Sequence, residues 1–169
     1  MINKINFFQE LDYVLNKFNL HKNDICIVGS SVLAIHNIRK NNDIDIIIKQ
    51  KIRNSLFNTN TKVTLSTNVE IVSCNWLNID DFDDKIINNQ RYHDRINGYK
   101  VAKIEILYLH KSISKRTKSL RDKELILKYL KAVSIWDRKL YLTLLVKYSI
   151  ASTLKKVKLL KNFILKKLL

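Results

Sequence analysis

The sequence predicts an α/β fold of the α+β type, in which a small mixed sheet with flanking helices is followed by a helical C-terminal segment. Short apolar runs bounded by polar residues, such as 25–28 and 44–48, are typical of buried strands. Runs in which apolar residues recur every three or four positions, such as 5–20, are typical of helices packed on a sheet. The 169 residues are 46% hydrophobic, which is enough for one substantial core.

Each expected element has a local signal. The expected helices cover residues 5–20, 32–38 and 49–57, and the expected strands cover residues 25–28, 42–48, 62–65 and 69–73. Asn97-Gly98 stands between two alternating runs, which predicts a β-hairpin. The acids of residues 80–84 suit the N-terminus of a helix, where they complement its dipole. A further helix that packs on the domain is predicted by Leu140, Leu144, Leu145 and Tyr148.

The composition points to a cytoplasmic protein with anionic partners. The chain has 31 basic and 15 acidic residues and a net charge of +16, so nucleic acid, nucleotides or anionic lipid are the expected partners. The abundance of Lys, Asn and Ile and the absence of proline are also typical of an AT-rich genome, which accounts for part of this charge. Cys26 and Cys74 are too few and too far apart for a disulfide framework or a zinc site, so we expect buried reduced thiols. Glu10 and Asp12 in the first apolar run argue against a signal peptide.

The residues with the clearest chemistry lie between positions 29 and 45. Gly29 and Ser30 follow the first strand directly, and glycine occurs only twice in the chain. A glycine lets the backbone approach a ligand closely, and a helix starting at Ser31 would direct N–H groups at an anion such as a phosphate. Asp43 and Asp45 are two residues apart on the next strand, so their side chains share a face. Two such carboxylates repel each other unless a cation lies between them, which predicts a site for Mg²⁺ or Mn²⁺.

This ordered set of a strand, Gly29-Ser30, a helix and Asp43-Ile44-Asp45 on a second strand resembles the nucleotidyltransferase fold of the DNA polymerase β superfamily. The resemblance implies that Asp43 and Asp45 hold Mg²⁺ or Mn²⁺, and that the Gly-Ser turn holds the phosphates of a nucleotide-activated donor. It also implies a third carboxylate on a following strand. Glu70 is the favoured candidate, and Glu105 is its rival.

A second block, residues 105–133, resembles small bacterial AbiEii-like nucleotidyltransferases. Lys111, Arg116, Lys118 and Asp122 match the basic and acidic positions of that family's motif, whereas Thr117 and Ser119 replace its proline and first aspartate. The resemblance implies that Lys111, Arg116 and Lys118 neutralise charge on the transferred group. The alternative is that these three residues form a solvated basic loop.

The last part of the chain differs from the rest. We expect a nucleotidyltransferase-like domain over residues 1–134 and a basic helical segment over residues 135–169, where eight lysines and no acid follow Arg138. This segment has the composition of a helix that lies on an anionic membrane surface. Its expected apolar face consists of Leu154, Val157, Leu160, Ile164, Leu165 and Leu168. The alternatives are a helix packed in a dimer and a tail that binds nucleic acid.

Together the two resemblances imply a metal-dependent transferase that moves a nucleotidyl or phospho-substituent group from a nucleotide-activated donor to an acceptor hydroxyl. The membrane-like segment favours a lipid-linked or surface-glycan acceptor, as in polysaccharide biosynthesis, at the inner face of the membrane. The alternatives are a toxin-type nucleotidyltransferase that modifies RNA and a non-catalytic antitoxin or binding module of the same fold.

His36, His93 and His110 are isolated, and we expect His93 at the surface.

Overall fold

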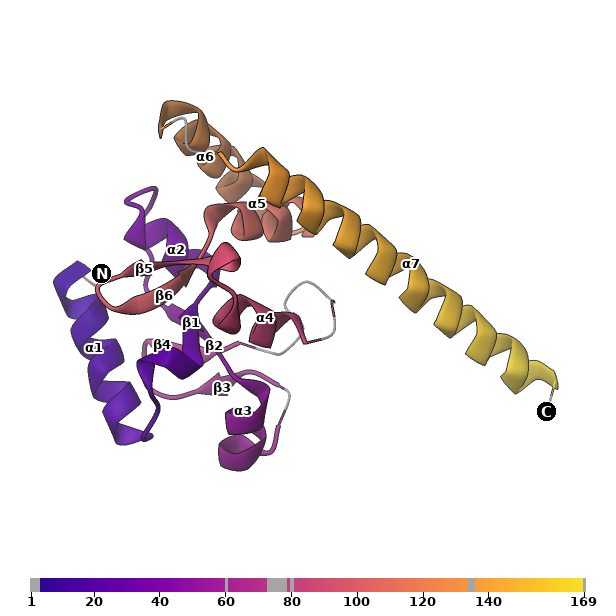
Figure 1. Cartoon of the computed structure of the whole chain (residues 1–169), viewed down its shortest axis with the longest axis horizontal. Helices are drawn as coiled ribbons and strands as arrows, with labels where there is room; N and C mark the ends of the chain where they lie inside the picture. Colours follow the sequence, from indigo (N-terminus) through magenta and orange to yellow (C-terminus); the bar gives the residue numbers. More distant parts are fainter. Residues whose placement is uncertain (1–3, 60, 73–78, 80, 134–135, 169) are drawn as a thin grey trace.

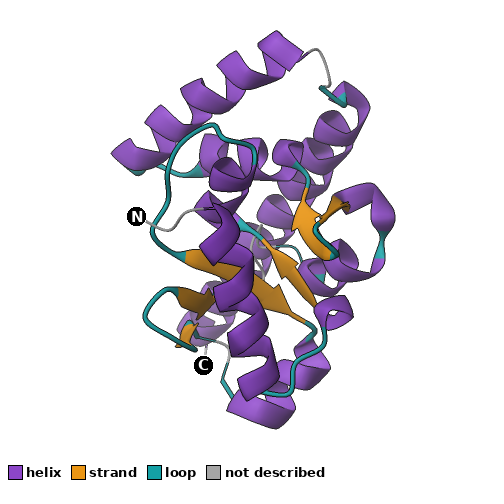
Figure 2. Ribbon diagram, turned by 90° about the vertical axis from the view of Figure 1, so that its left-hand side faces the viewer, coloured by secondary structure: helices purple, strands orange, loops and turns teal. Residues whose placement is uncertain are grey.

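The structure is a computed structural model that describes residues 4–59, 61–72, 79, 81–133 and 136–168. It confirms the predicted α+β class: helices enclose a six-stranded mixed sheet (Figure 2). The strands are β1 (Ile25–Ile27), β2 (Ile44–Ile48), β3 (Val63–Thr64), β4 (Val69–Ile71), β5 (His93–Ile96) and β6 (Tyr99–Ala102). The α-helices are α1 (Lys4–Lys17), α2 (Gly29–Ile35), α3 (Gln50–Phe57), α4 (Phe82–Asn88), α5 (Ile104–Ile113), α6 (Thr117–Val133) and α7 (Arg138–Leu168).

The order of the strands across the sheet is β3-β4-β2-β1-β6-β5. Strand β2 pairs antiparallel with β1 and parallel with β4, so it lies between these two strands. All three residues of β1 are buried, as are four of the five in β2. Because both faces of these central strands are covered, they consist mainly of isoleucine rather than alternating apolar and polar residues.

The predicted hairpin is confirmed: β5 and β6 pair antiparallel on either side of Asn97 and Gly98. Both turn residues have positive φ, +50° and +78°, as a two-residue hairpin turn of this kind requires. The acids Asp83 and Asp84 lie in the first turn of α4, as expected. Asp80 and Cys74 lie outside the described residues, whereas Cys26 is buried with a free thiol.

Three local expectations need correction. Strand β2 begins at Ile44, so Asp43 immediately precedes the strand instead of lying in it. Helix α2 already begins at Gly29 instead of after the Gly-Ser turn. His93 was expected at the surface, but it is buried, because its side chain faces α4 and its Nδ1 lies 2.7 Å from the carbonyl oxygen of Ile86.

Helix α7 belongs to the core at its start and leaves the domain at its end. Leu140 and Leu144 are buried and Tyr148 packs against the core, so the predicted packing of this helix is confirmed. Figure 1 shows α7 passing α5 and then extending beyond the rest of the chain toward the C-terminus. The expected domain boundary between residues 134 and 135 lies outside the described residues.

Candidate active site

Two of the three predicted carboxylates are direct neighbours across the sheet. In the parallel pairing of β2 with β4, Asp45 is the register partner of Glu70. Paired residues of adjacent strands project from the same face of a sheet, so the two side chains emerge side by side. Asp43 precedes Asp45 by two residues and is more exposed to solvent. The sheet therefore sets Asp45 beside Glu70, and Asp43 lies just before the strand that carries Asp45.

The carboxylate of Asp45 is repelled by the two neighbouring negative charges. Burial raises the pKa of Asp45 above its ordinary value, and the amide of Ser30 opposes this by donating a hydrogen bond. The negative charges of Glu70 and Asp43 raise the pKa of Asp45 further. A cation beside the three acids would relieve this repulsion.

Gly29 is required by its close contact with Asp45. The residue has a φ of +62°, and an added Cβ would lie 2.9 Å from the carboxyl carbon of Asp45. The next amide, that of Ser30, donates to Asp45 Oδ2 at 3.3 Å. A glycine here thus brings the backbone of the Gly-Ser turn against the acidic cluster, which no residue with a side chain allows.

Ser31 holds the segment that carries the two aspartates. Its hydroxyl is fully buried, donates to the carbonyl oxygen of Asp43 at 3.0 Å, and accepts from the amide of Asp45 at 2.8 Å. These two bonds tie the start of α2 to the start of β2. The hydroxyl of Ser31 thus positions Asp43 and Asp45, whereas the expected binding of a phosphate by backbone N–H groups near Ser31 remains a prediction.

Lys62 is a cationic neighbour of the acids that the sequence analysis did not single out. Its ammonium forms an ion pair with Glu70 Oε2, and the Lys62 side chain remains 57% exposed. The hydrogen bond to Glu70 raises the pKa of Lys62 above its ordinary value. The charges of Asp45 and Asp43 act in the same direction, so the ammonium lies within the field of all three acids.

The donor set suits Mg²⁺ or Mn²⁺, both of which prefer carboxylate oxygens. Within the described ranges, no three side chains of His, Cys, Asp or Glu stand close enough together to form a preassembled metal cluster. Two observations are nevertheless compatible with an ion held by Asp43, Asp45 and Glu70. The negative charges of Glu70 and Asp43 raise the pKa of Asp45, and the Asp45 carboxylate lies against the backbone of Gly29. The exposed ammonium of Lys62 would have to move aside.

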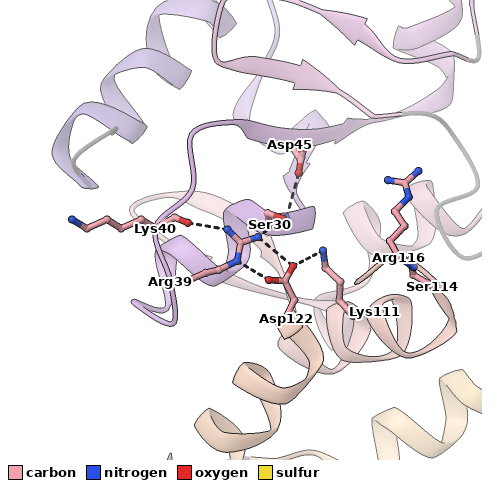
Figure 3. A network of polar contacts seen from close by, with 8 residues as sticks. All are labelled: Ser30, Arg39, Lys40, Asp45, Lys111, Ser114, Arg116 and Asp122. Carbon is pink, nitrogen blue, oxygen red and sulfur yellow. Dashed lines mark hydrogen bonds and ion pairs between the residues drawn. The ribbon is translucent and has the colours of Figure 1, made fainter. Parts of the chain in front are cut away.

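A cluster of three charges, in which Asp122 and Lys111 are buried and Arg39 is partly exposed, adjoins the Gly-Ser turn (Figure 3). Asp122 accepts hydrogen bonds from Arg39 Nε at 2.7 Å and Nη2 at 3.2 Å, and it forms an ion pair with Lys111 Nζ at 2.8 Å. The same Nη2 donates to Ser30 Oγ at 2.9 Å. Burial alone would raise the pKa of Asp122, but the hydrogen bonds from Arg39 and Lys111 outweigh it and lower the pKa. The cluster joins α6 and α5 to the turn beside Asp45.

The three predicted basic residues have different environments. Lys111 is buried and paired with Asp122, whereas Arg116 and Lys118 are exposed. Figure 3 shows the guanidinium of Arg116 apart from the hydrogen-bonded cluster. Sequence analysis missed Arg39, which occupies the position nearest the Gly-Ser turn. Its only sequence signal was its position in the segment between α2 and β2, the two elements that carry Ser30 and Asp45.

Glu105, the rival candidate for the third acid, has a structural role at the start of α5. It lies in the first turn of α5, is buried, and accepts a hydrogen bond from the amide of Asp137 at 2.9 Å. Burial raises its pKa above the ordinary value. Its carboxylate thus holds the segment that leads into α7, and the sheet register favours Glu70 as the partner of Asp45.

Comparisons of the chain with models of protein families, with curated proteins and with solved structures found no match. Among the helices in the described part of the chain, none is both long and apolar enough to cross a membrane.

Proposed function

We propose that the chain is a metal-dependent transferase of the nucleotidyltransferase superfamily. The observation that carries the proposal is the register of β2 with β4, which sets Glu70 beside Asp45 on one face of the sheet. Asp43, Asp45 and Glu70 would hold Mg²⁺ or Mn²⁺. When bound, such an ion supplies positive charge that stabilises transfer at a phosphorus atom.

The Gly29-Ser30 turn is the proposed location of the donor's phosphates. At Gly29 the absence of a side chain lets the Asp45 carboxylate lie against the backbone of the turn, so phosphates bound at the turn would lie beside the acids. The hydroxyl of Ser30 already accepts from Arg39, so this hydroxyl is oriented before a donor arrives. The acceptor hydroxyl would attack a phosphorus atom of the donor and form a new O–P bond. The bond from that phosphorus to the oxygen of the donor's leaving phosphate would break, and the hydroxyl proton would pass to solvent.

The cluster of Arg39, Asp122 and Lys111 is proposed to position the turn and to supply positive charge near it. Asp122 binds both Arg39 and Lys111. The guanidinium of Arg39 is thereby held in a position from which it donates to Ser30 Oγ. The exposed Arg116 and Lys118 are available for phosphate groups that extend from the turn. A hydroxyl on a lipid-linked or surface glycan is the proposed acceptor, and a hydroxyl on RNA is the alternative.

A second function, that of a non-catalytic binding module, is favoured by one observation. The ammonium of Lys62 pairs with Glu70, so this chain can balance part of the acidic cluster without a metal ion. In such a module the acids would hold no metal ion and take part in no reaction. An experiment has to separate this function from the enzymatic one.

The test is thermal unfolding with a panel of ribonucleoside triphosphates and nucleotide-activated sugars, each with and without Mg²⁺ or Mn²⁺. A ligand that binds the native state raises the melting temperature. A transferase should be stabilised by one nucleotide class only when the cation is present, and Asp43→Asn/Asp45→Asn should remove this effect.

The control is Asp94→Asn, which removes one exposed acid from β5. This strand forms the edge of the sheet that is farther from β2 and β4. It should behave as the wild type. A wild type that no combination of nucleotide and cation stabilises would leave the binding module as the better account.

A further inference from the structure

Helix α7 has an exposed aliphatic stripe. Its members are between 56% and 63% exposed, namely Leu142, Val146, Ile150, Leu154 and Val157. Their spacing of four, four, four and three residues places them on one side of the helix. Large aliphatic side chains scattered singly on a surface are ordinary, but five along one helix face form a continuous strip.

The stripe lies opposite the side of α7 that packs on the domain. The packed side consists of Leu140, Leu144, Leu145 and Tyr148, which are buried or partly buried against the core. At 100° per residue, the centres of the two sets lie on nearly opposite sides of the helix. Helix α7 therefore has two apolar sides, and within the described residues the outer one is left to solvent. The sequence pattern alone did not separate these two sides.

The charges around the stripe indicate what can cover it. The described side chains of α7 include the cations Arg138, Lys139, Lys147, Lys155, Lys156 and Lys158, and no Asp or Glu follows Asp137 in the sequence. A second copy of the helix placed against the stripe would bring these like charges together, which opposes self-association. The partner must be anionic where it meets the lysines and apolar where it meets the stripe.

An anionic bilayer meets both conditions. Its headgroups attract lysines, and the boundary between headgroups and acyl chains accepts aliphatic side chains from a helix lying in that plane. Single-stranded nucleic acid meets only the first condition, since its bases stack on aromatic side chains and the stripe has none. Because the stripe is turned away from the packed side, α7 can lie on a membrane without disturbing the core.

We propose that the outer face of α7, formed by these five aliphatic residues, binds the surface of anionic membranes. The lysines provide attraction at long range, and the aliphatic stripe provides the short-range contact. This inference concerns where the protein is located and does not depend on the activity proposed above.

The test is co-sedimentation of the full chain with vesicles made of equal parts phosphatidylcholine and phosphatidylglycerol, and with vesicles of phosphatidylcholine alone. The wild type should sediment with the first and much less with the second. Replacing three members of the stripe, in Val146→Ser/Ile150→Ser/Leu154→Ser, should weaken binding to the anionic vesicles by about tenfold or more, because inserted aliphatic area is lost.

A matched control removes the same number of exposed aliphatic residues, but from outside α7. Leu56, Leu120 and Val133 are exposed and lie outside α7, so Leu56→Ser/Leu120→Ser/Val133→Ser should bind as the wild type does. A third variant, Lys155→Gln/Lys156→Gln/Lys158→Gln, should weaken binding by about fivefold for each lysine, and salt should weaken the wild type in the same way. Far-ultraviolet circular dichroism and thermal unfolding identify any variant that fails to fold.

Three outcomes would overturn the proposal. The first is a wild type that does not sediment with anionic vesicles. The second is a folded stripe variant that sediments as well as the wild type, which would mean binding by charge alone. The third is self-association of the wild type, seen by analytical ultracentrifugation and abolished in the stripe variant, without vesicle binding; this would assign the stripe to a second copy of the chain.

Discussion

The carboxylate of Asp45 fills the space that a side chain at Gly29 would need. An added Cβ would lie 2.9 Å from its carboxyl carbon, and the φ of Gly29 is +62°. We therefore predict that Gly29→Ala displaces Asp45 as well as straining the backbone. The cost should be about 1 kcal/mol for the left-handed φ, with about 1–3 kcal/mol more for the overlap. Urea unfolding measures the total.

The other glycine of the chain provides the control for this prediction. Gly98 has a φ of +78°, but nothing lies within 4 Å of its hypothetical Cβ. Gly98→Ala should therefore show the backbone cost alone and leave cation binding intact. Equal losses of stability in the two variants would mean that the contact between Gly29 and Asp45 has no consequence.

The ionisation of Asp45 should oppose folding at neutral pH. Burial, followed by the charges of Glu70 and Asp43, raises its folded-state pKa above the ordinary aspartate value of 3.8. The folded protein therefore binds more protons than the unfolded chain in the pH range just above 3.8, so this group's contribution to stability falls as pH rises through that range. Asp45→Asn should raise the melting temperature at pH 7, and the difference should shrink as the pH is lowered. Calorimetry across that pH range would refute this if the variant melted at a lower temperature at pH 7.

Asp122 should make the opposite contribution. Its pKa is lowered because the hydrogen bonds from Arg39 and Lys111 outweigh the effect of burial. Its stabilising contribution is thus present above the ordinary pKa and lost as pH falls below about 3.8. Asp122→Ala leaves Lys111 buried without this partner, which should cost about 3–5 kcal/mol at pH 7. Chemical unfolding measures this cost.

A surface ion pair serves as the control for Asp122. Asp94 pairs with Lys103 at 3.3 Å, and the Asp94 side chain is largely exposed. Asp94→Ala should cost less than about 1 kcal/mol. If Asp122→Ala were as mild, the cluster around Arg39 could not be what holds α6 against the Gly-Ser turn.

Lys62 should compete with a metal ion for the acidic cluster. Its ammonium pairs with Glu70 and lies in the field of Asp43 and Asp45. Removing this charge in Lys62→Gln should tighten Mn²⁺ binding by about two- to fivefold, the range expected for an exposed ion pair. Isothermal titration calorimetry gives the affinity. Lys17→Gln, which removes an exposed lysine from α1, is the charge-matched control and should leave the affinity unchanged.

The parts of the fold that could be predicted from the sequence depend on local signals. The hairpin around Asn97 and Gly98 follows from two residues that tolerate positive φ. The buried strands β1 and β2 follow from runs of isoleucine with polar ends. Helix starts were less accurate, since Gly29 is permissive of several conformations and already belongs to α2.

The parts that could not be predicted depend on contacts between distant positions. No local pattern states that Asp45 pairs in register with Glu70 rather than lying near Glu105, because register is fixed only when β4 joins the sheet. The bond between Arg39 and Asp122 spans 83 residues of sequence. His93 illustrates the same limit, since its polarity suggested exposure but the packing of α4 buries it.

The most direct test of the account is a Mn²⁺ titration of the free protein followed by electron paramagnetic resonance, which counts bound ions without requiring a substrate. The account predicts saturable binding by the wild type. It also predicts loss of that binding when Asp43, Asp45 and Glu70 are replaced together by Asn, Asn and Gln, in a variant that circular dichroism shows to be folded. Saturable binding that survives unchanged in this variant, or a wild type that binds no Mn²⁺, would contradict the assignment of the three acids to a metal site.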